Sequence, residues 1–137
     1  MAGKAKGEAI VATRSISFWG GIDPKTGRII DKRSGSFGRK ISGKVFVFPY
    51  GKGSSTSSAV FLEAVRCNKA PAAIVNAHTE PLLTVGAILA MKLYGKSIPV
   101  VDHVETDPCE VIANHDLVEV DADRGILMVT RARRGKK

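Results

Sequence analysis

The sequence predicts an α/β fold, in which a mixed β sheet with a barrel-like core carries two flanking helices. The middle of the chain alternates strand, helix, strand, helix and strand, an order that calls for right-handed parallel crossovers. Hairpin patterns at both ends add antiparallel strands. With 137 residues the chain has room for one core, so residues 1–137 are expected to form a single domain, with residues 1–8 and 131–137 as mobile tails.

The first half of the chain has the character of β structure. Residues 8–16 are rich in β-branched side chains and predict a strand. A hairpin is predicted over residues 18–31 because its centre, Asp23-Pro-Lys-Thr-Gly27, has a proline that fixes φ and a glycine that accepts a positive φ. A basic loop rich in glycine and serine follows at residues 34–40, and residues 44–49 form a short strand.

Two helix–strand units follow. Residues 59–66 show apolar side chains at helical spacing, and residues 71–76 form an apolar strand suited to burial on both faces. The next helix opens at a proline, continues over residues 82–94 and stops at a glycine. Residues 97–102 predict another buried strand, and residues 116–131 a final hairpin.

Composition and charge narrow the classes of function. Apolar residues make up 44% and charged residues 25% of the chain, as in a soluble globular protein. The start has no apolar signal region, and no stretch approaches the roughly 20 apolar residues of a membrane span, so a cytoplasmic location without a membrane partner is expected. Cys67 and Cys109 are too few for a disulfide framework or a metal site, and buried packing is expected for both.

The formal net charge of +8 is confined to residues 1–52, which hold 11 basic and 3 acidic residues (11 − 3 = +8). Such a segment favours an anionic partner: a nucleic acid, an acidic protein face or a phosphorylated small molecule. The basic run at residues 131–137 is expected to be a solvated tail, and no nucleic-acid-binding module is recognisable.

Residues 51–58, Gly-Lys-Gly-Ser-Ser-Thr-Ser-Ser, are the most informative segment because they join a predicted strand to a predicted helix. Glycine lets the backbone approach a ligand closely, and the free N–H groups of the first helical turn form an anion site. Neither a P-loop nor the dinucleotide fingerprint fits, since Gly53 follows Lys52 and Thr56 replaces the third glycine. ATP and NAD are therefore not expected as ligands.

The hydroxyl run in this segment has a structural and a chemical interpretation. A helix N-cap role for Ser54 or Ser55 is the structural one, but five consecutive hydroxyl residues exceed what one cap requires. The positive end of a helix stabilises an alkoxide, so a serine there can act as a nucleophile or a general base. The motif contains no histidine, which argues against an ordinary catalytic triad.

The chain resembles the small subunit of the aconitase X family. Its succession of strand, Gly-x-Gly-Ser-Ser and helix is similar to the swivelling β/β/α domain of the aconitase superfamily, in which the first serine of this motif moves the substrate proton. The matching stretches cover nearly all of residues 9–130. They are Trp19-Gly-Gly-Ile-Asp, Thr26-Gly-Arg-Ile-Ile-Asp31, Gly43-Lys-Val-Phe-Val-Phe-Pro, Gly51-Lys-Gly-Ser-Ser-Thr-Ser-Ser, Ala70-Pro-Ala-Ala-Ile-Val and Ile98-Pro-Val-Val-Asp.

The resemblance implies that one loop supplies a catalytic residue, three substrate contacts and a residue that shapes the backbone. These are Ser54 as the general base, Lys52, Gly53 and Ser55 as substrate-binding residues, and Gly51 as the loop-shaping glycine. Two positions depart from the family pattern. Thr56 stands where other aconitases carry an arginine for a carboxylate, and Arg33-Ser34 stands where His-Pro is expected.

The implied reaction is the dehydration of (R)-5-phosphomevalonate to trans-anhydromevalonate 5-phosphate, a step of an archaeal-type mevalonate pathway towards isoprenoids. The resemblance implies a hydro-lyase that is active only with a larger partner subunit, in a heterodimer or a higher assembly. This chain alone would bind no metal and no cofactor. The 4Fe-4S iron–sulfur cluster of the superfamily is expected in the large subunit, because clusters need several cysteine thiolates.

Other functions stay open at this point. One alternative is a dehydratase subunit for another hydroxy acid, such as a hydroxyproline. A second is a basic non-catalytic nucleic-acid-binding domain, and a third is a swivel module that closes a partner's site without chemistry. His78 and His103 each follow a predicted strand, where α/β proteins often place ligands, but ordinary loop positions are expected for both. His115 has no supporting pattern.

Overall fold

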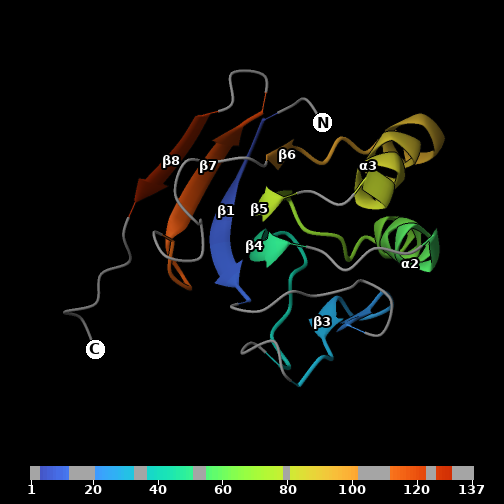
Figure 1. Cartoon of the computed structure of the whole chain (residues 1–137), viewed down its shortest axis with the longest axis horizontal. Helices are drawn as coiled ribbons and strands as arrows, with labels where there is room; N and C mark the ends of the chain where they lie inside the picture. Colours follow the sequence, from blue (N-terminus) through green and yellow to red (C-terminus); the bar gives the residue numbers. More distant parts are fainter. Residues whose placement is uncertain are drawn as a thin grey trace.

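A curled six-stranded sheet forms the centre of the protein, and two helices, α2 (Ser55–Arg66) and α3 (Pro81–Tyr94), lie next to each other over one of its faces (Figure 1). This arrangement confirms the predicted α/β class. The computed structural model describes residues 4–12, 21–32, 37–50, 55–78, 81–101, 112–122 and 126–130.

The main sheet combines parallel and antiparallel strands. In chain order they are β1 (Lys4–Val11), β4 (Val45–Tyr50), β5 (Ala73–His78), β6 (Val100–Val101), β7 (Leu117–Asp121) and β8 (Ile126–Thr130). Their order in the sheet is β6-β5-β4-β1-β7-β8. The first four of these run parallel, and β7 is antiparallel to both β1 and β8. The parallel strand–helix–strand units and the terminal hairpin are therefore confirmed.

Each face of the sheet carries its own hydrophobic core. Phe46 and Phe48 of β4 point to the helix side, where they join Phe61 of α2, and all three are fully buried. Val45 and Val47 lie in the opposite core together with residues of β7 such as Val118, which the curl of the sheet brings to that side. Residues 45–48 of β4 are therefore all apolar, because both faces of this strand are covered.

The predicted hairpin is a separate two-stranded sheet, β2 (Ile22–Asp23) with β3 (Arg28–Ile29). Its turn closes with a 2.8 Å hydrogen bond from the Gly27 N–H to the Asp23 carbonyl, and Gly27 has φ of 73°. Ile22 and Ile29 are buried in the helix-side core. The short hairpin is held by this apolar contact, since two strands alone are only marginally stable in water.

Three boundaries differ from the predictions. Strand β1 begins at Lys4, because residues 4–8 pair with residues 117–121 of β7, so the expected mobile tail is wrong for residues 4–8. Helix α2 begins at Ser55 instead of residue 59. Strand β6 is two residues long instead of six, and part of the predicted strand lies outside the described residues.

Some predictions concern parts of the chain that the structure does not describe, namely the end of the first predicted strand and the tail at residues 131–137. Within the described ranges, no helix is both long and apolar enough to cross a membrane. The single domain over residues 1–137 and the cytoplasmic location stay predictions.

Candidate functional site

The parallel strands end at one edge of the sheet, which we call the carboxyl edge. Tyr50 and His78, the last residues of β4 and β5, are direct partners in the strand register. Helix α2 begins at Ser55, five residues after Tyr50, and α3 begins at Pro81, three residues after His78. The connections that enter both helices therefore start from neighbouring points, and this edge is where open α/β sheets bind ligands.

The predicted catalytic loop belongs to this edge by its place in the chain. Gly51, Lys52, Gly53 and Ser54 lie outside the described residues, and Ser55 is the first residue of α2. Ser54 directly precedes the first residue of α2 in the sequence, and the first turn of a helix has free N–H groups. The roles assigned to these five residues stay predictions.

The charges of the two helices favour an anion at the carboxyl edge. Neither α2 nor α3 has an acidic residue in its first turn, so the partial positive charge of each amino end is not offset by a carboxylate of its own helix. Basic residues occupy the last turns instead, Arg66 in α2 and Lys92 in α3. This distribution suits an alkoxide, a carboxylate or a phosphate group in front of the helices.

Asn76 is a polar residue of the carboxyl edge without a predicted role. It is fully buried in β5, two residues before the strand ends, and its register partner is Phe48 of the helix-side core. Paired residues of parallel strands face the same way, so the amide lies on the side of α2 and α3. A buried amide is normally hydrogen-bonded, and a lone asparagine in an apolar strand is the signal that could have identified it.

A charged cluster lies near the opposite edge, at the start of β4. Lys44 Nζ is 2.8 Å from Glu8 Oε1, and this ammonium holds the pKa of the Glu8 carboxyl below its ordinary value. His115 Nδ1 is 3.9 Å from Glu8 Oε2, and Arg39 Nη1 is 3.4 Å from His115 Nε2. His115, which has no predicted role, therefore lies beside the Glu8–Lys44 ion pair, away from the carboxyl edge.

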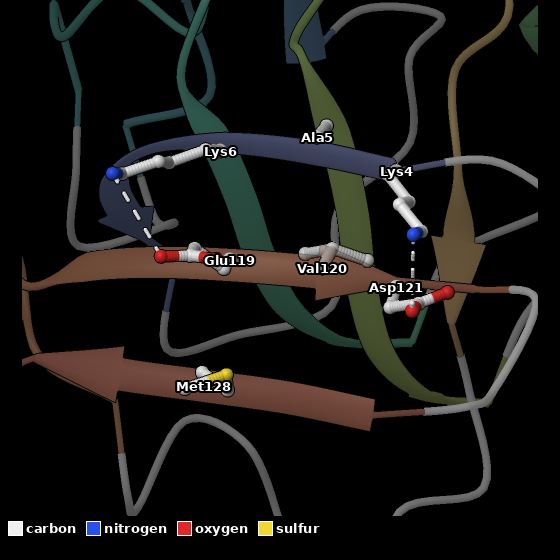
Figure 2. A pocket seen from close by; sticks show the side chains of 7 residues that line it. All are labelled: Lys4, Ala5, Lys6, Glu119, Val120, Asp121 and Met128. Atoms are coloured by element: carbon white, nitrogen blue, oxygen red, sulfur yellow. Dashed lines mark ion pairs between the residues drawn. The ribbon is translucent and has the colours of Figure 1, made fainter.

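A groove of about 390 Å³ runs along β1, β7 and β8 (Figure 2). Two cross-strand ion pairs border it: Lys4 to Asp121 at 3.9 Å and Lys6 to Glu119 at 3.7 Å. Met128 of β8 lies along the same groove. Because Lys4 opens β1, which runs parallel to β4, the groove lies towards the edge opposite the predicted catalytic loop.

The described cysteine does not fit the expectation of buried packing. Cys67 directly follows the last residue of α2 and is half-buried, with its Sγ 3.6 Å from Glu63 Oε2. Arg66 forms an ion pair with Glu63 beside it and lowers the pKa of that carboxyl. Among the residues that the structure describes, no group of three or more potential ligands could hold a metal ion. Cys109 and His103 fall outside those residues.

Comparison with known proteins identifies relatives along nearly the whole chain. The family model described as the aconitase X swivel domain matches residues 1–129. The phosphomevalonate dehydratase small subunit of Methanocella arvoryzae is 42% identical over 125 residues, which cover 91% of this chain and 90% of that protein.

Two further relatives add a longer enzyme and a solved structure. The cis-3-hydroxy-L-proline dehydratase of Pseudomonas aeruginosa is 41% identical over 100 residues, which cover 73% of this chain but only 17% of that protein. The crystal structure of Thermococcus kodakaraensis aconitase X in its holo-form superimposes with a TM-score of 0.84 at 39% identity, covering 95% of this chain and 92% of the matched one.

Proposed function

Because this chain belongs to the aconitase X swivel-domain family, we propose that it is the small subunit of a phosphomevalonate dehydratase. The reaction removes water from (R)-5-phosphomevalonate and gives trans-anhydromevalonate 5-phosphate, an intermediate on the way to isoprenoids. The observation that carries this proposal is the identity of 42%, which extends over nine-tenths of both this chain and a relative of that name.

In the proposed mechanism Ser54 is the general base. Its alkoxide takes a proton from the carbon next to the carboxylate, and the electron pair of that C–H bond forms the new double bond. The C–O bond on the next carbon breaks, and the hydroxyl leaves with its electron pair and takes a proton from the solvent to become water. The amino end of α2, which carries no acidic residue in its first turn, supports the alkoxide by its dipole and its N–H groups.

The same edge supplies the proposed contacts to the anionic ends of the substrate. Lys52, Gly53 and Ser55 bind the substrate, and Gly51 shapes the backbone between β4 and α2. Two helix amino ends without acidic residues in their first turns support an assignment to a molecule that carries both a phosphate and a carboxylate.

An iron–sulfur cluster would supply Lewis-acid assistance to the leaving hydroxyl, but the described residues of this chain do not fit one. Cys67 lies just beyond the carboxyl end of α2, and a helix of 12 residues separates it from Ser55 by roughly 18 Å at 1.5 Å per residue. A thiolate there is too far from the carboxyl edge. We therefore assign the cluster to a larger partner subunit.

Two observations support the partner subunit. The relative in Methanocella arvoryzae is named a small subunit. The hydroxyproline dehydratase matches over only 17% of its length, so in that enzyme the same domain is a minor part of a longer chain. The proposed active site forms where this chain meets its larger partner.

The decisive variant is Ser54→Ala, produced together with the larger aconitase X chain of the same organism. Loss of a general base typically lowers kcat by about 10²- to 10⁴-fold, and that loss is expected with an intact complex and little change in KM. Ser58→Ala, in the same hydroxyl run but one turn into α2, is the matched control and should keep its activity. Full turnover by the Ser54→Ala complex would favour a swivel module without chemistry.

A hydroxy acid of the proline type is the second candidate substrate, because the hydroxyproline dehydratase matches at a similar identity of 41%. The assembled enzyme should be offered phosphomevalonate and cis-3-hydroxy-L-proline side by side. We expect turnover of the phosphorylated substrate alone, and a preference for the unphosphorylated one would reverse the assignment.

A further inference from the structure

Helix α3 is packed in the reverse of the usual sense. Its small residues Gly86, Ala87 and Ala90 are buried against the rest of the protein. Among residues 85–94 of the helix, for which burial is described, the large apolar residues are exposed by 37% to 62%, and they are Val85, Ile88, Leu89, Met91, Leu93 and Tyr94. We call these six residues, which at 100° per residue spread around most of the helix, the α3 outer face. A surface helix normally buries its large apolar side chains, so this pattern is typical of a helix that is covered on both sides.

The α3 outer face is large enough to matter energetically. If a whole large residue offers on the order of 200 Å² of surface, the six exposed fractions together amount to roughly 500 Å². The largest apolar patch of a typical monomer covers about 300–600 Å² and is often functional. A stable complex buries about 800 Å² on each partner, so this single helix provides more than half of one side of a standard interface.

We propose that the α3 outer face docks onto the larger subunit of the enzyme, an inference that rests on the proposed function. Helix α3 starts at the carboxyl edge and extends for 14 residues, about 20 Å, so the α3 outer face begins at Val85, roughly 6 Å from that edge. A subunit that covers the whole face therefore reaches from the far end of the helix towards the site that it completes. In the hydroxyproline dehydratase the matching segment is a small part of a longer chain. This agrees with a stable contact between this domain and a larger one.

Charge determines which occupant fits. From Val85 to Val101 the chain has two charged residues, Lys92 and Lys96, both exposed and both basic. Lys92 lies three residues after Leu89 and four after Ile88, within the apolar surface itself. A second copy of this chain would present the same surface, which offers no carboxylate from residues 85–101 to pair with Lys92. The larger subunit is therefore expected to present an apolar surface with a carboxylate opposite Lys92.

The test compares two equally exposed apolar residues. Leu93 on α3 is 62% exposed and Met128 on β8 is 61% exposed. The larger aconitase X chain of the same organism is titrated with wild type, Leu93→Asp, Leu93→Ala, Met128→Asp and Met128→Ala. We expect Leu93→Asp to raise the Kd at least about tenfold and Leu93→Ala to raise it less, with both Met128 variants staying within about twofold of wild type. Circular dichroism establishes that each variant is folded.

The possible results separate this inference from the proposed function. Wild-type affinity of folded Leu93→Asp would overturn the docking surface while leaving the enzyme assignment intact. A complex that forms through α3 but does not dehydrate phosphomevalonate would support the surface and overturn the assignment. Sedimentation of this chain as a dimer that Leu93→Asp dissociates, without any effect on the larger chain, would overturn the inference in favour of a second copy. Absence of any wild-type complex would overturn both.

Discussion

The interaction of Glu8 with Lys44 is a contact whose contribution depends on pH. The Lys44 ammonium lowers the pKa of the Glu8 carboxyl from its ordinary value of 4.5. A carboxyl whose pKa is lower in the folded than in the unfolded protein adds stability above pH 4.5. That contribution is lost as the pH falls through the folded-state pKa, when the carboxyl takes up a proton.

Lys44→Met is therefore expected to lower the free energy of unfolding at neutral pH by about 0.5 kcal/mol, a small value because both partners are more than a third exposed. The difference from wild type should shrink as the pH falls below 4.5. Urea denaturation at several pH values measures it, with Lys40→Met as an exposed control. A difference that does not vary with pH would show that Lys44 stabilises the fold by packing alone.

Residues with a local role could be predicted, and residues whose role depends on distant partners could not. Gly27 was expected to take a positive φ because its turn requires it, and its φ is 73°. The burial of Asn76 is not predictable from its neighbours in the sequence, because it follows from strand register and helix packing. Ser54 was identified by a local motif together with a family resemblance, and its role stays a prediction.

At the scale of elements, the same contrast holds for boundaries. The predicted limits of α3 match because a proline opens it and Gly95, with φ of 67°, ends it. The predicted start of β1 is too late because Lys4 and Lys6 have low strand propensity, and their pairing with β7 is visible only in the folded chain. The predicted start of α2 is too late because serine and threonine have low helix propensity.

At Gly27 the β2–β3 hairpin packs closely against Ser42 and Lys69. A methyl group there would lie 2.9 Å from the Lys69 carbonyl oxygen and would collide with Ser42 Oγ, which donates a hydrogen bond to that carbonyl. We expect Gly27→Ala to lower the free energy of unfolding by about 1–2 kcal/mol because of the left-handed backbone. Overpacking should lower it by about 1–3 kcal/mol more. Chemical denaturation measures the loss.

Gly43→Ala is the matched control for this hairpin variant. Gly43 has a similar φ of 69° but nothing within 4 Å of the added methyl group, so only the backbone contribution applies. Equal losses in the two variants would contradict the close approach at Gly27.

At the scale of the molecule, ion pairs offset part of the positive charge of the first 52 residues. The excess of +8 arises from the first 52 residues, which suggested an anionic partner. In the structure Lys4 and Lys6 pair with Asp121 and Glu119 of β7, and Lys44 pairs with Glu8. Part of the basic segment is thus balanced by carboxylates, some of them more than a hundred residues away in the sequence.

This pairing predicts weak interaction with nucleic acids. Lysines engaged with carboxylates release few counterions from a phosphate backbone, and counterion release supplies most of non-specific binding. Fluorescence anisotropy with a labelled DNA duplex should therefore show no measurable binding at physiological salt. Tight binding with a steep salt dependence would contradict this expectation and favour the nucleic-acid-binding alternative.

The interior position of β1 has a consequence for how the protein is made. Strand β1 pairs with β4 on one side and with β7, synthesised more than a hundred residues later, on the other. At about 5–20 residues per second, its second edge stays open for on the order of ten seconds. Its lysines discourage stray pairing during that interval. A truncation that removes β7 and β8 would therefore leave β1, at the other end of the chain, without one of its two partner strands.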